Sequence, residues 1–354
     1  MPRPAEAIPA APPAALRLRL DRAALAANWR ALDALSGAAR AGAAVKADAY
    51  GLGAVEAVPV LAAAGCEDFF VAHWSEVAPL LALIDPSRLS VLHGPLSHAD
   101  VAFSRAVGVK PVLNSPAQAR RWREAGGGVC DVMVDTGINR LGFAMRDLGA
   151  LGAAGLAIDI CMSHLASADD DVDQNREQLA RFGEVRAAVP ARRYSLANSA
   201  GIALGGAYHA DLTRPGLALY GGVPRRELAP LIVPVAFPEA AVIQVRELAA
   251  GDAGGYNATF GAPRAMRAGV VALGYADGYL RCWSGKGRFA WQGVELASLG
   301  RVSMDMTVVD LSSAPDCGEG DWLAVPYDPV ASAAATGLSQ YELFTLLGRR
   351  FARG

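Results

Sequence analysis

Between residues 16 and 222 the sequence alternates short runs of apolar residues with longer segments that carry apolar residues at helical spacing. Short apolar runs are typical of buried strands, and the helical segments between them indicate parallel crossovers. The seventh connection is the exception, because it is short and rich in glycine. The pattern predicts an α/β fold with a parallel (β/α)8 barrel of the TIM type. The expected strands are residues 42–46, 68–72, 89–94, 110–114, 129–135, 157–165, 192–198 and 212–221.

The expected helices begin at residues that favour helix N-termini. The first covers residues 21–37, where Asp21 suits the N-cap position, and it follows an alternating strand at 16–20. A doubly wound open sheet is the alternative, but no glycine-rich dinucleotide turn follows the first strand. Further helices are expected at residues 53–65, 75–84, 115–126 and 173–189.

The pattern changes near residue 230. From there on, short alternating runs are divided by glycine and aspartate turns, which predicts a mainly β domain. One helix over residues 339–352 closes the chain. We therefore expect a flexible tail over residues 1–14, a barrel domain over 15–228 and a C-terminal β domain over 229–354.

Composition narrows the function classes. The net charge of −2 gives no electrostatic reason to expect a nucleic acid or a membrane as partner. The five cysteines are odd in number and scattered, which favours reduced thiols in a cytoplasmic protein. Prolines and Glu6 interrupt the N-terminus too early for a secretion signal. We find no apolar stretch long enough for a membrane span.

Unusual polar residues gather where the predicted strands end. Active sites of such barrels lie at the C-terminal ends of the strands, so these side chains should share one face. Each of these residues, taken singly, can have a purely structural role, as a rim charge, part of a loop turn, a core histidine or an ion-pair partner. Structural roles do not readily explain why all of them fall on one face. The set comprises Lys46, His93, Asn114, Asp135, Arg140, His164, Asn198, Ser199, Arg214 and Gly216.

This set suits an aldehyde cofactor that a lysine holds covalently. A shielded Lys46 has a lowered pKa and can act as nucleophile and later as base. The phosphate of the cofactor would bind backbone N–H groups and hydroxyls, and Arg214 would face its ring nitrogen. The expected phosphate ligands are Tyr50, Ser199, Gly216 and Leu217.

Seven segments carry a family resemblance: AVKADAYGLGA, VDTGINRLGF, SHLASAD, LANSAGI, RPGLALYGG, ALGYADGY and GRVSMDMTVVDL. Together, and in this order, they resemble alanine racemase, an enzyme that interconverts L-alanine and D-alanine. Related barrels that bind pyridoxal 5′-phosphate share the lysine strand but lack GYADG and GRVSMDM. The resemblance implies a barrel domain followed by a β domain, with pyridoxal 5′-phosphate as the cofactor.

The resemblance also implies residue roles. Lys46 would hold the cofactor, Arg214 would touch its pyridine nitrogen, and Arg140 would contact the substrate carboxylate. The remaining cofactor contacts would be Tyr50, His164, Asn198, Ser199, Gly216 and Leu217.

Racemisation needs a base on each face of the substrate. The resemblance assigns these two roles to Lys46 and to Tyr275 of the partner subunit, which is offered together with Met304 in a homodimer with shared sites. His164 and Arg214 would help to hold Tyr275 anionic, because a free phenol with a pKa of about 10 is a poor base at neutral pH.

The sequence departs from the common family pattern at several positions. Met133 stands where many members have a carbamylated lysine, so we expect Asn139 to orient Arg140 instead. Arg349 stands where some members have a gate tyrosine. The other departures are Leu52 for a histidine and Ser303 for a cysteine.

Other functions stay open at this point. A racemase of broader specificity, for example for serine, or a decarboxylase would use the same cofactor, and a carrier protein would bind it without catalysis. A metal-dependent hydrolase would need clustered ligands, which His73, His93, His98 and His209 do not show, so we expect no metal. The sequence does not separate a biosynthetic, cell-wall role from a catabolic one.

Overall fold

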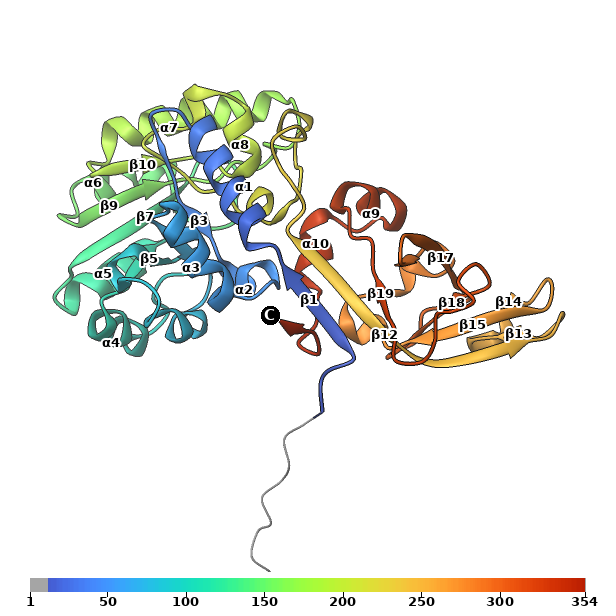
Figure 1. Cartoon of the computed structure of the whole chain (residues 1–354). Helices are drawn as coiled ribbons and strands as arrows, with labels where there is room; N and C mark the ends of the chain where they lie inside the picture. Colours follow the sequence, from blue (N-terminus) through green and yellow to red (C-terminus); the bar gives the residue numbers. More distant parts are fainter. Residues whose placement is uncertain (1–11, 354) are drawn as a thin grey trace, which may run out of the picture. The chain divides into compact units, whose positions relative to one another are not determined.

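We analysed a computed structural model that describes residues 12–353, and these residues form two compact units (Figure 1). The barrel unit comprises Leu20–Ala236 and Asp328–Thr345. The second unit comprises Phe237–Tyr327, with the described residues up to Arg19 and from Leu346 on. Each unit therefore combines separate segments of the chain, whereas the sequence predicted two continuous domains that meet near residue 228. Of the tail expected over residues 1–14, residues 1–11 lie outside the described residues.

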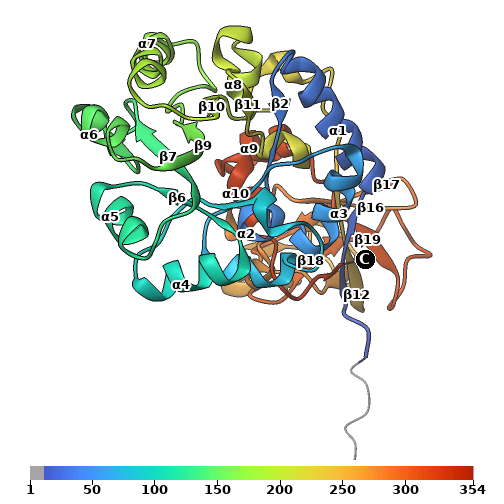
Figure 2. The same ribbon diagram turned by 90° about the vertical axis from the view of Figure 1, so that its left-hand side faces the viewer.

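A ring of parallel strands forms the centre of the barrel unit (Figure 2). The hydrogen-bonded pairings between neighbouring strands of this ring are parallel, as βαβ crossovers require. The strands are β2 (Arg40–Ala41), β3 (Ala43–Ala44), β4 (Phe69–Val71), β5 (Leu89–Val91), β6 (Lys110–Leu113), β7 (Val129–Asp135), β9 (Ala157–Met162), β10 (Arg193–Ser195) and β11 (Leu212–Thr213). β2 and β3 are one run interrupted at Gly42, so the ring has eight positions.

Backbone hydrogen bonds close the ring. The N–H of Gly42 donates to the carbonyl of Thr213 (2.9 Å), and the N–H of Val45 donates to Phe70 on the other side (2.9 Å). Between β10 and β11, the N–H of Arg214 donates to Ala197 (2.8 Å). The predicted (β/α)8 barrel is confirmed, and each predicted barrel strand contains an observed one.

Helices connect most of the strands. α1 (Arg22–Leu35) begins as predicted, because the Asp21 carboxylate accepts the N–H of Ala24 at 2.9 Å. The helix predicted over 75–84 is wrong: two short 3₁₀ turns, Trp74–Glu76 and Ala78–Leu80, stand there instead, and Pro79 in the second turn has no N–H for a helical hydrogen bond. The other connecting helices are α3 (Ala54–Ala64), α4 (His98–Val107), α5 (Pro116–Glu124), α6 (Leu148–Gly152), α7 (Asp173–Ala188) and α8 (Ser199–Ala203). Within residues 12–353, every helix is too short or too polar to cross a membrane.

The second unit is built on an antiparallel ring, which confirms the predicted β domain. Its long strand β12 (Ala236–Leu248) pairs at one end with β19 (Trp322–Ala324) and at the other with β15 (Met266–Val271). The ring is completed by β16 (Arg288–Trp291), β17 (Val294–Leu299) and β18 (Thr307–Asp310). The strand expected at 16–20 is β1 (Leu16–Leu20), and it belongs to this sheet.

The C-terminal segment differs from its prediction. Two helices, α9 (Pro329–Thr336) and α10 (Gln340–Thr345), join the barrel unit, where the Gln340 side chain bonds both backbone groups of Val223 (2.7 and 2.9 Å). The single helix expected over 339–352 is therefore wrong beyond Thr345. The chain turns at Gly348, whose N–H donates to Asp277 (3.1 Å), and β20 (Ala352–Arg353) then pairs with β1.

Ion pairs fill the end of the barrel where the strands begin. Lys110 Nζ lies 2.6 Å from an Asp159 oxygen and 3.9 Å from Asp131, and Arg193 pairs with Asp68 (2.7 Å) and Asp159 (2.9 Å). Burial raises the pKa of Asp131 to about 6, although Lys110 and the hydroxyl of Ser90 both favour its charged form. Asp131 is therefore a titratable group inside the barrel.

This carboxyl makes the stability of the chain depend on pH. The folded state binds the Asp131 proton more tightly than the unfolded state, so its contribution is complete at low pH and is lost as pH rises through about 6. Between about pH 4 and 6, the difference in unfolding free energy between wild type and Asp131→Asn should change by about 1 kcal/mol per pH unit. Denaturant titrations at several pH values measure it, and a constant difference would contradict the raised pKa.

Candidate active site

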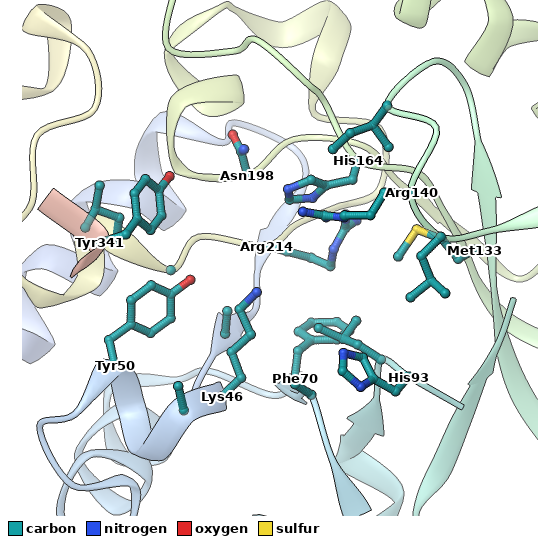
Figure 3. A pocket seen from close by; sticks show the side chains of 18 of the residues that line it. Lys46, Tyr50, Phe70, His93, Met133, Arg140, His164, Asn198, Arg214 and Tyr341 are labelled. Atoms are coloured by element: carbon teal, nitrogen blue, oxygen red, sulfur yellow. The ribbon is translucent and has the colours of Figure 1, made fainter. Parts of the chain in front are cut away.

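A cavity of about 800 Å³ opens at the C-terminal ends of the barrel strands (Figure 3). Most of the predicted site residues line it, and they lie at the ends of five strands, β3, β7, β9, β10 and β11, or in the loops that follow these strands. From the predicted cofactor and substrate set these are Lys46, Tyr50, Arg140, His164, Asn198, Ser199, Arg214, Gly216 and Leu217. Strands of a parallel barrel share one C-terminal edge, which is why residues far apart in sequence meet here.

Lys46 is the lysine of this cavity. The sequence contains two others, Lys110 in the barrel interior and Lys286 in the second unit. The Lys46 side chain points into the cavity toward the group formed by His164, Arg140 and Arg214 (Figure 3). Burial lowers the pKa of Lys46, and the charges of Arg140 and Arg214 lower it further, while Glu76 opposes them. The amine is thus more readily deprotonated than an exposed lysine.

Directly after Lys46 the backbone adopts a left-handed conformation. Residues 47–50 all have positive φ, between 52° and 58°, within the turn α2 (Lys46–Tyr50). A left-handed turn costs about 1–2 kcal/mol per residue for side chains with a Cβ. Backbone bonds from Gly51 to Ala47 (2.8 Å) and from Ala49 to Val45 (2.9 Å) help to hold it. Such strain concentrates at functional sites.

A cradle of N–H groups and hydroxyls lines the same cavity as Lys46. The Ser199 hydroxyl accepts the N–H groups of Gly216 (2.9 Å) and Ala218 (3.2 Å), and Asn198 caps α8 by accepting the N–H of Gly201 (2.8 Å). A Cβ on residue 216 would lie 2.2 Å from the Tyr50 hydroxyl, so only glycine fits here. Burial raises the pKa of Tyr50, which keeps this hydroxyl protonated and able to donate.

Arg214 and His164 form the polar floor of the cavity. The Arg214 guanidinium donates to the Ser195 hydroxyl and to the Ser163 carbonyl. Burial lowers the pKa of Arg214 to about 10, so it remains a cation at neutral pH. Burial and the neighbouring cations lower the pKa of His164 to about 3. His164 is therefore neutral near pH 7, so any help it gives to a phenolate comes from an N–H hydrogen bond and not from charge.

The loop that carries Arg140 folds around one carboxylate. Asp135 accepts the N–H groups of four loop residues, from Gly137 (2.8 Å) to Arg140 (2.9 Å). Within residues 12–353 no carboxylate pairs with the Arg140 guanidinium, and no hydrogen bond joins it to the Asn139 side chain, so the expected support from Asn139 is not found. Met133 lines the cavity as an apolar side chain and cannot be carbamylated.

The other two predicted residues lie in the second unit, next to each other. The N–H of Tyr275 donates to Ser303 (3.0 Å), and the N–H of Ala276 donates to Met304 (2.9 Å). The two segments approach so closely at Gly274 that a Cβ there would lie 2.4 Å from the Met304 carbonyl oxygen. The structure thus brings the Tyr275 and Met304 segments together, as the shared role predicted for them requires. Met304 is exposed.

Sequence reasoning missed Tyr341. This side chain comes from α10 and lines the cavity, with its ring 6.3 Å from that of Tyr50 (Figure 3). Arg349, expected at a gate position, is exposed in the second unit and does not line the cavity. No local signal in the sequence marks Tyr341, because only the docking of α10 onto the barrel places it there.

The described residues do not group as a metal site would require. Between residues 12 and 353, no three His, Cys, Asp or Glu side chains are close enough together to hold a metal ion. His73 and His93 do lie together, with ring centroids 4.2 Å apart, but they have no third partner of that kind.

Comparison with known proteins agrees with the geometry. The family models for the N-terminal and C-terminal domains of alanine racemase match residues 20–224 and 235–354. Alanine racemase from Acidiphilium cryptum is 41% identical over 95% of this chain and 97% of its own length. Alanine racemase from Methylobacterium nodulans is 40% identical over 95% of both.

A solved structure is also similar. Alanine racemase from Bartonella henselae, whose crystal structure contains covalently bound pyridoxal phosphate, has a TM-score of 0.87 and 33% identity to this chain. The similarity covers 97% of this chain and 99% of that one, so both units have counterparts there. The chain therefore belongs to the alanine racemase family.

Proposed function

We propose that this chain interconverts L-alanine and D-alanine with pyridoxal 5′-phosphate attached to Lys46, and that Lys46 and Tyr275 are its two bases. Membership of the alanine racemase family makes the chain an amino-acid isomerase. One observation carries the assignment of the site. Among the described residues, the cavity contains a single lysine, with arginines and an N–H cradle around it.

The residues that line the cavity fit this cofactor. Arg140 and Arg214 bring positive charge, and no carboxylate stands among the described lining residues, which suits a phosphate and an amino-acid carboxylate. The cradle at Ser199 and Gly216 would hold the phosphate. The cavity volume of about 800 Å³ also lies in the range of cofactor sites. When bound, the cofactor withdraws electrons from the α-carbon of the amino acid and so acidifies its α-hydrogen.

The chain's own residues then place and move the proton. Lys46, whose pKa is lowered, is available as a neutral amine that accepts the α-hydrogen on one face. Arg140 would bind the substrate carboxylate. Arg214 is a cation that can only donate hydrogen bonds, so facing the ring nitrogen of the cofactor it would disfavour protonation of that nitrogen and limit electron withdrawal. Limited withdrawal favours return of the proton to the α-carbon.

The second base would come from another copy of the chain. Tyr275 belongs to the second unit, and in the proposed homodimer it reaches the cofactor of the partner subunit together with Met304. Met304 and Met306 are 52% and 39% exposed, and they form apolar surface beside Tyr275 that a second copy would cover. Because His164 is neutral, Arg214 is the charged group left to favour an ionised phenol at the shared site.

The cysteines support a reducing location. Cys66, Cys130, Cys161 and Cys317 are buried and form no disulfide, and Cys282 is partly exposed. Free thiols persist in the cytoplasm, where disulfides are kept reduced, so we assign the protein to that compartment. Fractionation with a disulfide-bonded periplasmic marker would test the assignment.

The attachment site can be tested directly, because the chain has three lysines to distinguish. Reduction of the cofactor-loaded protein with borohydride should leave the pyridoxyl mass on the peptide that contains Lys46. Peptides with Lys110 and Lys286 serve as internal controls, and Lys46→Ala should lose the label. Label on another lysine, or none after reconstitution with the cofactor, would overturn the assignment.

A further inference from the structure

Glu76 ties the segment that follows Lys46 to the neighbouring strand. One of its carboxylate oxygens accepts the N–H of Ala47 at 2.5 Å. The other accepts the N–H groups of Ala72 (2.7 Å) and His73 (2.8 Å), directly after β4. Three backbone donors from the ends of two adjacent strands therefore converge on one side chain. Hydrogen bonds to an ionised acceptor are about twice as strong as neutral ones.

The bond to Ala47 is placed where the backbone needs support. Ala47 is the first of the four consecutive residues with positive φ. The alanines at 47 and 49 give this turn no side-chain hydrogen bonds, and Asp48 supports its far end by accepting the N–H of Ala54 (2.7 Å). Glu76 thus holds the start of the turn, next to the reactive lysine.

Glu76 also balances the charges around Lys46. Arg140 and Arg214 act on the lysine from the loop after β7 and from the end of β11, and both disfavour its protonated form. The Glu76 carboxylate opposes these arginines, because its charge raises the pKa of Lys46. It also raises the pKa of His93, which burial and the neighbouring His73 lower. Without Glu76, the lysine would face cations alone.

We propose that Glu76 is the positioning residue of Lys46: it clamps the left-handed turn to the end of β4 and supplies negative charge that acts on the amine. The inference rests on the proposed function only in taking Lys46 as the lysine that binds the cofactor and acts as a base. The clamp and the charge can be measured separately, and neither measurement depends on turnover.

The test uses the full chain after any bound aldehyde has been released with hydroxylamine. Competitive acetylation with acetic anhydride across a pH series, read by mass spectrometry, gives the pH midpoint of Lys46, with Lys110 and Lys286 as references. Hydrogen exchange of the peptide that covers residues 46–53 reports on the turn. The variants are Glu76→Gln, which keeps volume but removes charge, and Glu76→Asp, which keeps charge but shortens the reach.

In Glu76→Gln the Lys46 midpoint should fall by about one pH unit, because an opposing charge is lost. Exchange of the turn peptide should rise about tenfold, since one amide cannot accept all three N–H groups. Glu76→Asp should speed exchange with a smaller shift in the midpoint, and it serves if the glutamine variant does not fold. The control Asp85→Asn, an exposed carboxylate that caps Ser87, should change neither measurement.

An unchanged midpoint and unchanged exchange in folded Glu76→Gln would overturn the proposal. Faster exchange without a shift in the midpoint would reduce Glu76 to a structural cap and remove the charge role. Failure of the proposed function would look different. Borohydride would then leave no cofactor on Lys46 of the wild type, whatever the Glu76 variants show.

Discussion

Racemisation is expected to fall about 10²–10⁴-fold in both directions when Tyr275 is replaced by phenylalanine, since a positioned general base contributes about that much to rate. The substitution keeps the ring and its packing, including the Arg281 guanidinium 5.4 Å from the ring centre, and removes only the hydroxyl. Both directions must fall together, because the equilibrium constant between the enantiomers does not depend on the enzyme. The rates are measured with each single enantiomer of alanine.

Exchange of the α-hydrogen separates the two bases in the same variant. By the proposed roles, Lys46 removes the α-hydrogen of D-alanine and Tyr275 that of L-alanine. With Lys46 intact, D-alanine in deuterated water should still exchange its α-hydrogen without inverting, while L-alanine should exchange far more slowly. Equal exchange from both enantiomers would contradict separate bases and indicate that one group serves both faces.

Mixing two inactive variants should restore activity if the sites are shared between subunits. Lys46→Ala lacks the cofactor lysine and Tyr275→Ala lacks the second base, so neither homodimer has an intact site. In a mixed dimer one site combines the intact Lys46 of one chain with the intact Tyr275 of the other. Random exchange of equal amounts makes half of the dimers mixed, so activity should return to about a quarter of wild type per chain. Assays before and after refolding of the mixture measure it.

A matched control uses the double variant Lys46→Ala/Tyr275→Ala mixed with an equal amount of wild type. With shared sites, mixed dimers have no intact site, and activity per chain should fall to about a quarter. With sites built within one chain, about half would remain. Mass spectrometry of the intact dimers shows whether the chains have exchanged. Exchange without recovered activity in the first mixture would rule out sharing.

The barrel and most of its site could be predicted from the sequence because both follow from local patterns. Strands of a parallel barrel are covered on both sides, so they appear as short, mostly apolar runs such as that of β4. Once the strands are numbered, a polar residue at a strand end belongs to the shared C-terminal face. That rule was enough to predict that Lys46, His164 and Arg214 meet, and they do.

The tertiary structure alone decided how that lysine is held. Tyr341 and Glu76 reach the site through the docking of α10 onto the barrel and through a 3₁₀ turn where a longer helix was expected. The left-handed turn after Lys46 has alanine at two of its four positions, and alanine carries no local signal for positive φ. Its conformation depends instead on contacts with residues distant in sequence, such as the carboxylate of Glu76. Local sequence patterns therefore determined which strand-end residues form the site, and long-range packing determined their geometry and added Tyr341 and Glu76.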